Sequence, residues 1–131
     1  MACRILIVED QPLIAMGLED AVYGLGHVLV GIAACKVDAL AWADETDVAL
    51  VDVFLLDGPT GPEIGRILAQ HGVSVLFMTG NPEELGDGII GTLGVISKPV
   101  LDAEAIEAIR YAVDRHEEHR GTPPARLVEF S

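Results

Sequence analysis

The first apolar run of the chain ends at two acids: residues 4–10 are RILIVED, closing with Glu9 and Asp10. Three later apolar runs also end at a polar residue: VALVD at 48–52, VSVLFMT at 73–79 and GVISK at 94–98. Short runs rich in Val, Ile and Leu are typical of buried parallel strands. The carboxyl ends of parallel strands meet at one edge of an open α/β sheet, where ligands bind. We therefore expect the polar residues that end the four runs to lie close together.

Stretches with helical spacing alternate with these runs. A second strand is expected over residues 27–33, and helices over about 11–25, 37–45, a stretch ending near 70, and 102–119. This alternation predicts a doubly wound, flavodoxin-like α/β fold, with five parallel strands in the order 2-1-3-4-5 and helices on both faces. Residues 81–94 carry four glycines, which predict a short and irregular fourth helix. One domain is expected over 1–120, followed by a tail over 121–131, because Pro123 and Pro124 cannot continue the last helix.

Composition limits the possible partners. The 131 residues include 8 Lys and Arg against 21 Asp and Glu, which gives a formal net charge of −13. Such a field repels phosphate backbones, so direct binding of nucleic acid is not expected. No apolar run approaches the roughly 20 residues that span a bilayer, so neither a membrane segment nor a membrane partner is expected. The chain is predicted to be cytoplasmic, with Cys3 and Cys35 as free thiols.

The residues at the predicted sheet edge have a common chemistry. Crowded carboxylates require a cation, and their hard oxygen atoms suit Mg²⁺ or Mn²⁺. Asp10 and Asp52 are the expected direct ligands, with Glu9 acting through water. A strand-end aspartate such as Asp52 can accept a phosphoryl group as an acyl phosphate. The Lys98 ammonium and the Thr79 hydroxyl would then stabilise the phosphoryl oxygens.

These motifs together resemble a receiver domain of the two-component response regulators, over about residues 3–118. The matching residues are the acidic pair at 9–10, LVDV at 50–53, the loop with Asp57, Gly58 and Gly61, FMTG at 77–80, and SKP at 97–99. The resemblance implies that Asp52 receives its phosphoryl group from a sensor histidine kinase or a histidine phosphotransfer protein. It also implies that the backbone carbonyl of Phe54 is a further Mg²⁺ ligand and that the bond before Pro99 is cis.

One position departs from the pattern of the family. Receivers usually place a switch aromatic three residues before the lysine, and this chain has Val95 there. The FMTG motif without that aromatic is similar to a variant group of single-domain receivers in alphaproteobacterial stress signalling, whose motif begins Phe-Ala-Thr-Gly. Met78 stands in place of the alanine. Thr79 and residues 80–82 are then expected to carry the switch.

The expected function is that of a single-domain response regulator, not a conventional enzyme. It would signal by contacting an unknown downstream protein, or act as a phosphate sink. The expected contact surface is the face of helix four, strand five and helix five, with Ile89, Ile90, Val100 and Tyr111.

Two alternatives stay open. A haloacid-dehalogenase-like phosphohydrolase would need an acid two residues after the nucleophile, where this chain has Phe54. A receiver-like interaction module that is never phosphorylated is the second alternative, because Val95 removes half of the usual switch.

Overall fold

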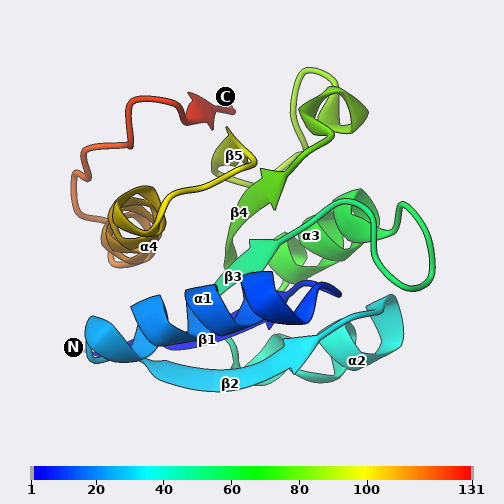
Figure 1. Cartoon of the computed structure of the whole chain (residues 1–131), viewed down its shortest axis with the longest axis horizontal. Coiled ribbons are helices and arrows are strands. Elements are labelled where there is room, and N and C mark those ends of the chain that lie inside the picture. Colours follow the sequence, from blue (N-terminus) through cyan, green and yellow to red (C-terminus); the bar gives the residue numbers. More distant parts are fainter. Residues whose placement is uncertain (1, 131) are drawn as a thin grey trace.

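A computed structural model describes residues 2–130 and shows a central sheet with helices on both faces (Figure 1). The strands are β1 (Arg4–Val8), β2 (Val28–Ala33), β3 (Val48–Val51), β4 (Ser74–Thr79), β5 (Gly94–Ser97) and β6 (Val128–Glu129). The helices are α1 (Pro12–Gly24), α2 (Lys36–Ala41), α3 (Gly61–Gln70) and α4 (Asp102–His116), with 3₁₀ turns η1 (Ala43–Glu45) and η2 (Pro82–Leu85). Met1 and Ser131, the outer ends of the expected domain and tail, lie outside the described residues.

The strand order is β2-β1-β3-β4-β5-β6. The first five strands are parallel, so the predicted doubly wound fold and its order 2-1-3-4-5 are confirmed. The predicted number of strands is wrong, because β6 adds a sixth strand that pairs antiparallel with β5. This strand lies within the segment that was expected to be a tail.

The predicted irregularity of the fourth helix is confirmed. The described segment between β4 and β5 forms only the four-residue turn η2. Gly86 and Gly88, which follow η2, have φ angles of 55° and 128°, a region that side chains with a Cβ rarely adopt. A regular helix cannot pass through these positions. The helix that follows β5, which is the fifth in the predicted fold, is therefore labelled α4.

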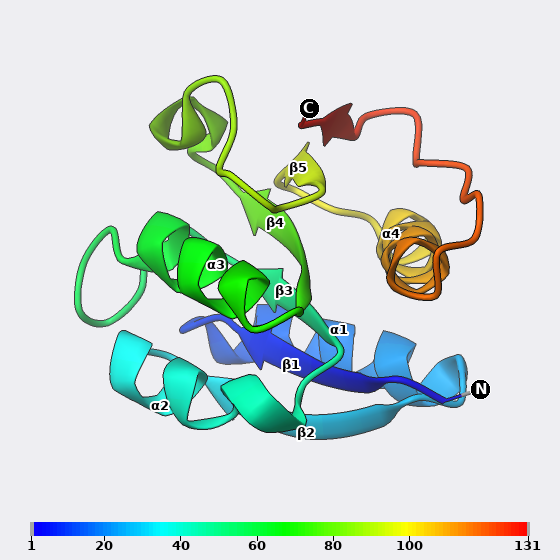
Figure 2. The same cartoon turned by 180° about the vertical axis from the view of Figure 1, so that it is seen from behind.

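The apolar core lies in two layers, one on each face of the sheet. α1 and α4 cover one face, and α2 and α3 cover the other, which the reverse view brings forward (Figure 2). Successive residues of β1 alternate between the layers: Ile5 and Ile7 face α1 and α4, whereas Leu6 and Val8 face α2 and α3. Within residues 2–130, no helix combines the length and the apolar character that crossing a bilayer requires.

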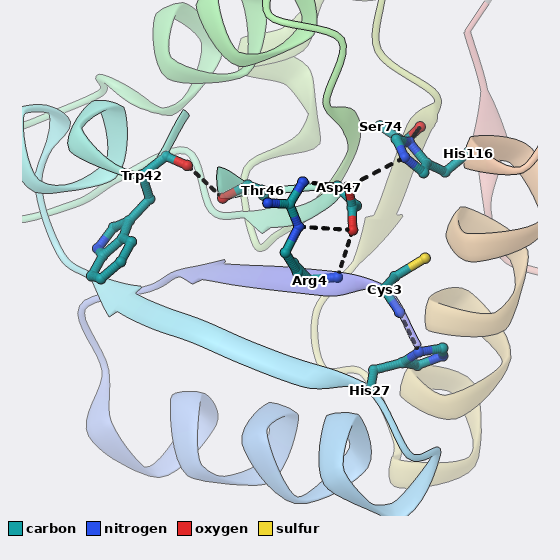
Figure 3. Close-up of polar contacts among 8 residues, drawn as sticks. All are labelled: Cys3, Arg4, His27, Trp42, Thr46, Asp47, Ser74 and His116. Carbon is teal, nitrogen blue, oxygen red and sulfur yellow. Dashed lines mark hydrogen bonds and ion pairs between the residues drawn. The ribbon is translucent and has the colours of Figure 1, made fainter. Parts of the chain in front are cut away.

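A polar network closes the amino-terminal edge of the sheet (Figure 3). Asp47, just before β3, accepts hydrogen bonds from the backbone N–H of Arg4 at 2.8 Å and from its guanidinium at 3.1 Å. His116 at the end of α4 places Nε2 3.6 Å from Asp47, and its Nδ1 lies 3.1 Å from the Ser74 hydroxyl. The network therefore joins β1, β3, β4 and α4 at the edge opposite to the predicted site. Cys3 and Cys35 are free thiols, as predicted.

Candidate functional site

The carboxyl-terminal edge of the sheet brings together the residues that end the four apolar runs. Glu9 and Asp10 directly follow β1, and Asp52 directly follows β3. The two strand ends are adjacent, because the Asp52 N–H donates to the carbonyl of Val8 at 2.9 Å. One carboxylate oxygen from each of the three acids lies within 4.8 Å of the others. The predicted juxtaposition of the three acids is present in the structure.

Lys98 connects two of these acids. Its Nζ donates to Oε1 of Glu9 at 2.7 Å and to Oδ2 of Asp52 at 2.8 Å. Burial disfavours the Lys98 ammonium, but the hydrogen bonds and charges of Asp52 and Glu9 outweigh burial, so the pKa of Lys98 is raised above its ordinary value. Lys98 is therefore held as a cation at the centre of the site.

Glu9 is placed less favourably as an anion. Its exposed fraction is only 4%, and this burial, together with the charge of Asp52, raises the pKa of Glu9 above its ordinary value. The hydrogen bond and charge of Lys98 offset only part of this rise. The three carboxylates of the site therefore outnumber the one Lys98 ammonium that can neutralise them.

The donor set fits a divalent cation. Three clustered carboxylates, of which two share the Lys98 ammonium, supply hard oxygen ligands and leave excess negative charge, which suits Mg²⁺ or Mn²⁺. Asp10 is partly exposed and gives access from solvent, whereas Glu9 and Asp52 are buried. Phe54 lies in the loop two residues after Asp52, and the role of its carbonyl as a ligand stays a prediction.

The Asp52 carboxylate is held in one orientation. Oδ1 accepts the backbone N–H of Val53 at 2.7 Å, while Oδ2 accepts Lys98. The start of α3 packs directly under this residue, since a Cβ on Gly61 would overlap the Asp52 carbonyl oxygen. The Val53 donor could not be found from the sequence, because every residue except proline carries a backbone N–H.

Thr79 ends β4 and is fully buried. Its hydroxyl accepts the N–H of Asn81 at 3.1 Å, and its carbonyl accepts the N–H of Lys98 at 2.9 Å. The structure thus connects Thr79 both to the loop that follows it and to the backbone of the lysine. The peptide bond between Lys98 and Pro99 is cis.

Three other predicted positions lie in β5, in α4 and in the segment that precedes β5. Val95 is buried in the layer under α2 and α3, where it pairs with Phe77 on one side and with Val128 on the other.

Tyr111 was expected on the contact surface, and this prediction is wrong. It is 1% exposed, and its hydroxyl donates to Glu129 at 2.7 Å, because the segment after α4 covers it. Ile90, by contrast, is 87% exposed.

Comparison with known proteins gives the family. No family model matches the chain. Its fold is similar to that of the receiver domain of the PhyR response regulator from Erythrobacter litoralis, with a TM-score of 0.73 and 30% sequence identity. That match covers 95% of this chain and 96% of the other. The chain belongs to the response regulator receiver domains.

This receiver domain is similar to parts of longer proteins. It is 41% identical over 92 residues to the phyllosphere-induced regulator PhyR of Methylorubrum extorquens, a match covering 67% of this chain and 34% of that protein. The chain thus spans about a third of the length of that relative. The anti-anti-sigma factor PhyR from Bartonella quintana is 29% identical, with a TM-score of 0.68 and coverage of 90% and 50% of the two chains. Receiver domains are parts of signalling regulators, and the similarity gives no support to the alternative of a dehalogenase-like phosphohydrolase.

Proposed function

We propose that Asp52 accepts a phosphoryl group from a sensor histidine kinase or a histidine phosphotransfer protein. The observation that carries this proposal is the Lys98 ammonium, which lies 2.8 Å from Asp52 and 2.7 Å from Glu9, at a cluster of acids that Asp10 completes. A bound Mg²⁺ or Mn²⁺, held by Asp10, Asp52 and the Phe54 carbonyl with Glu9 acting through water, would neutralise charge on the phosphoryl oxygens.

The transfer requires little beyond positioning. An oxygen of Asp52 attacks the phosphorus of a phosphohistidine, an O–P bond forms, and the P–N bond breaks with its electron pair staying on the imidazole, which takes a proton from water. The ionised carboxylate has no proton to remove, so no general base is needed. Lys98 exchanges its contact with Asp52 for one with a phosphoryl oxygen, where it stabilises the developing charge. The phosphoryl group is removed in a separate hydrolysis: water attacks the phosphorus, the bond between the phosphorus and the Asp52 oxygen breaks, and inorganic phosphate leaves while the carboxylate is restored.

The output of this receiver would be a contact with another protein. A PhyR relative is named an anti-anti-sigma factor, and we propose that this chain acts in signalling of the same kind, by contacting a downstream protein or by draining phosphoryl groups from a kinase. We place this activity in the cytoplasm, where ATP is available for the phosphorylation of such kinases. The exposed Ile90 beside β5 belongs to the surface that would change.

A labelling experiment tests the acceptor. The protein is incubated with Mg²⁺ and either radiolabelled acetyl phosphate or a phosphorylated kinase, and the label is followed for acid stability and hydroxylamine lability. We expect labelling of the unaltered chain, loss of label when EDTA removes the metal, and recovery with Mn²⁺. The variant D52N should take no label.

The matched control is D57N, which removes a carboxylate from the exposed loop between β3 and α3. Asp57 contacts Lys36 and Thr60, and neither is part of the acid cluster. D57N should be labelled normally. Label that persists in D52N would overturn the acceptor assignment. Folded protein that takes no label from any donor would favour an interaction module that is never phosphorylated.

A further inference from the structure

The segment after α4 folds back and lies along the outer edge of β5 (Figure 1). Its strand β6 pairs Val128 with Val95 and Glu129 with Gly94. The N–H of Phe130 continues this contact by donating to the carbonyl of Leu93 at 2.9 Å. The chain therefore covers the edge at which its parallel sheet would otherwise end.

Side chains of this segment close both layers of the core. Leu127 packs against the layer under α1 and α4, while Phe130 packs against the layer under α2 and α3. The Phe130 ring occupies space next to the shortened fourth crossover, since a Cβ on Gly88 would lie 2.9 Å from the Phe130 Cγ. A Cβ on Gly94 would overlap the Val128 carbonyl. The two glycines thus make room for the folded-back segment.

A polar clamp holds the segment at the surface. The Arg126 guanidinium donates to both oxygens of Glu104 at 2.6 and 2.9 Å and to the carbonyl of Pro99 at 2.9 Å. Glu129 accepts the hydroxyl of Tyr111 at 2.7 Å. The hydrogen bond from Arg126 is the main reason that the pKa of Glu104 is lowered to about 2. The clamp is therefore ionised throughout the neutral range.

The docking of the segment is nevertheless limited. β6 has two residues and both are exposed. The clamp residue Arg126 is exposed as well, and exposed ion pairs contribute little to stability. Segments held by few buried contacts and exposed backbone bonds are the first to open in a native protein.

The same segment contacts the strand that leads to the site. Val95, opposite Val128, lies three residues before Lys98. Arg126 binds the carbonyl of Pro99, the residue directly after Lys98. The segment therefore holds the backbone on both sides of Lys98, the residue whose ammonium the proposed function moves toward a phosphoryl oxygen.

We propose that residues 126–130 form a detachable edge strand, which is released when Asp52 is phosphorylated and thereby frees β5 to pair with an extended strand of a partner protein. This inference rests on the proposed function. The surface that residues 126–130 occupy defines the partner. It fits a strand with a basic residue to bind Glu104 and apolar residues at the positions of Leu127 and Phe130. Strand addition to an exposed sheet edge is a general mode of peptide recognition.

Hydrogen exchange followed by NMR on the full chain tests the release. Beryllofluoride with Mg²⁺ is added as the phosphoryl mimic, and the Phe130 amide is compared with those of Thr79 and Lys98. We expect exchange at Phe130 to become about tenfold faster or more, because its bond to Leu93 opens. D52N should show no change.

A second experiment tests whether the β5 edge binds a strand in the absence of beryllofluoride. The double variant R126A/F130A removes the clamp and the apolar anchor, and R120A is the matched control that removes an exposed arginine from the connection to the segment. A fluorescent peptide of residues 122–130 should bind the double variant about tenfold more tightly than the unaltered chain or R120A. Addition of beryllofluoride to the unaltered chain should also increase peptide binding.

The outcomes separate the two proposals. If beryllofluoride changes the amide chemical shifts of Thr79 and Lys98 but leaves hydrogen exchange at Phe130 unchanged, the detachable strand is overturned and the acceptor proposal stands. No response at Thr79 or Lys98 would overturn the acceptor and, with it, the coupling. Equal peptide binding by the double variant and the unaltered chain would show that the β5 edge is not a strand-binding surface.

Discussion

The Lys98 ammonium lies 2.8 Å from Oδ2 of Asp52, although the two residues are 46 positions apart in the chain. Before any phosphoryl group arrives, the lysine already neutralises the carboxylate that would attack. Its second bond, to Glu9, spreads one positive charge over two buried acids. The site therefore depends on this single cation for its stability as well as for its proposed chemistry.

The variant K98A should lose both contributions. Two buried carboxylates would face each other without a cation, so we expect a loss of roughly 1–3 kcal/mol in the free energy of unfolding. Added Mg²⁺ should raise the Tm of K98A more than that of the unaltered chain, because the metal replaces the missing charge. Calorimetry with and without Mg²⁺ measures this. K36A, which removes a partly exposed lysine paired with Glu63, is the control and should change little. An equal Mg²⁺ effect in K98A and the unaltered chain would contradict the prediction.

The substitution D47A should weaken the amino-terminal edge of the sheet. The Arg4 N–H and guanidinium lose their acceptor, which should cost roughly 1–3 kcal/mol in urea unfolding. Burial works against the Asp47 carboxylate, but the Arg4 hydrogen bonds outweigh burial and lower its pKa below the ordinary value.

A carboxyl group whose pKa is lowered on folding stabilises the protein above its unfolded pKa and loses that stabilisation as the pH falls through its folded pKa. The stability difference between the unaltered chain and D47A should therefore be full at neutral pH and shrink below about pH 4. The control D44A, at a side chain that is 91% exposed, should follow the unaltered chain. A difference that does not vary with pH would contradict this account.

Restoring an aromatic at the switch position should destabilise the fold. Val95 is 5% exposed and lies between Phe77 and Val128. A larger ring in V95Y overpacks this layer, at a cost of about 1–3 kcal/mol. Urea unfolding measures the cost. I90Y, which adds a ring at an exposed position, should have little effect, and a stable V95Y would show that the layer can accommodate a switch ring.

The end of α4 carries a correctable strain. Glu118 has a φ of 61°, in the left-handed region that glycine adopts without penalty. E118G should therefore stabilise the protein by about 0.5–1 kcal/mol, measured by thermal unfolding. E117G, at a residue with a φ of −85°, should instead destabilise it. Stabilisation of both variants would point to an effect on the unfolded chain alone.

Residue periodicity predicts the central part of this fold well. Strand order and the acid cluster follow from where apolar runs stop, since the geometry of a parallel sheet brings those stops together. The four glycines between β4 and β5 predict the reduced fourth helix, because their backbone preference is local. Tyr111 could not be placed correctly, because the segment that covers it is distant in the sequence.

The same limit applies to β6 and to the Asp47 network. The two residues of β6 carry no recognisable period, and the contacts around them join residues far apart in the chain, such as Arg126 and Glu104, 22 positions away. Arg4 and Asp47 are 43 residues apart, and an Arg and an Asp at strand ends are common surface residues. Only tertiary contacts select these partners.

The network around Asp47 also determines where the molecule can yield. It fastens β1, β3, β4 and the end of α4 at one edge, while β5 and β6 take no part in it. β1, β3 and β4 are thus joined at the amino-terminal edge of the sheet, whereas β5 and β6 are not. We therefore expect a displacement that starts at Lys98, at the opposite end of β5, to be taken up by β5 and β6 rather than by the strands that the Asp47 network joins.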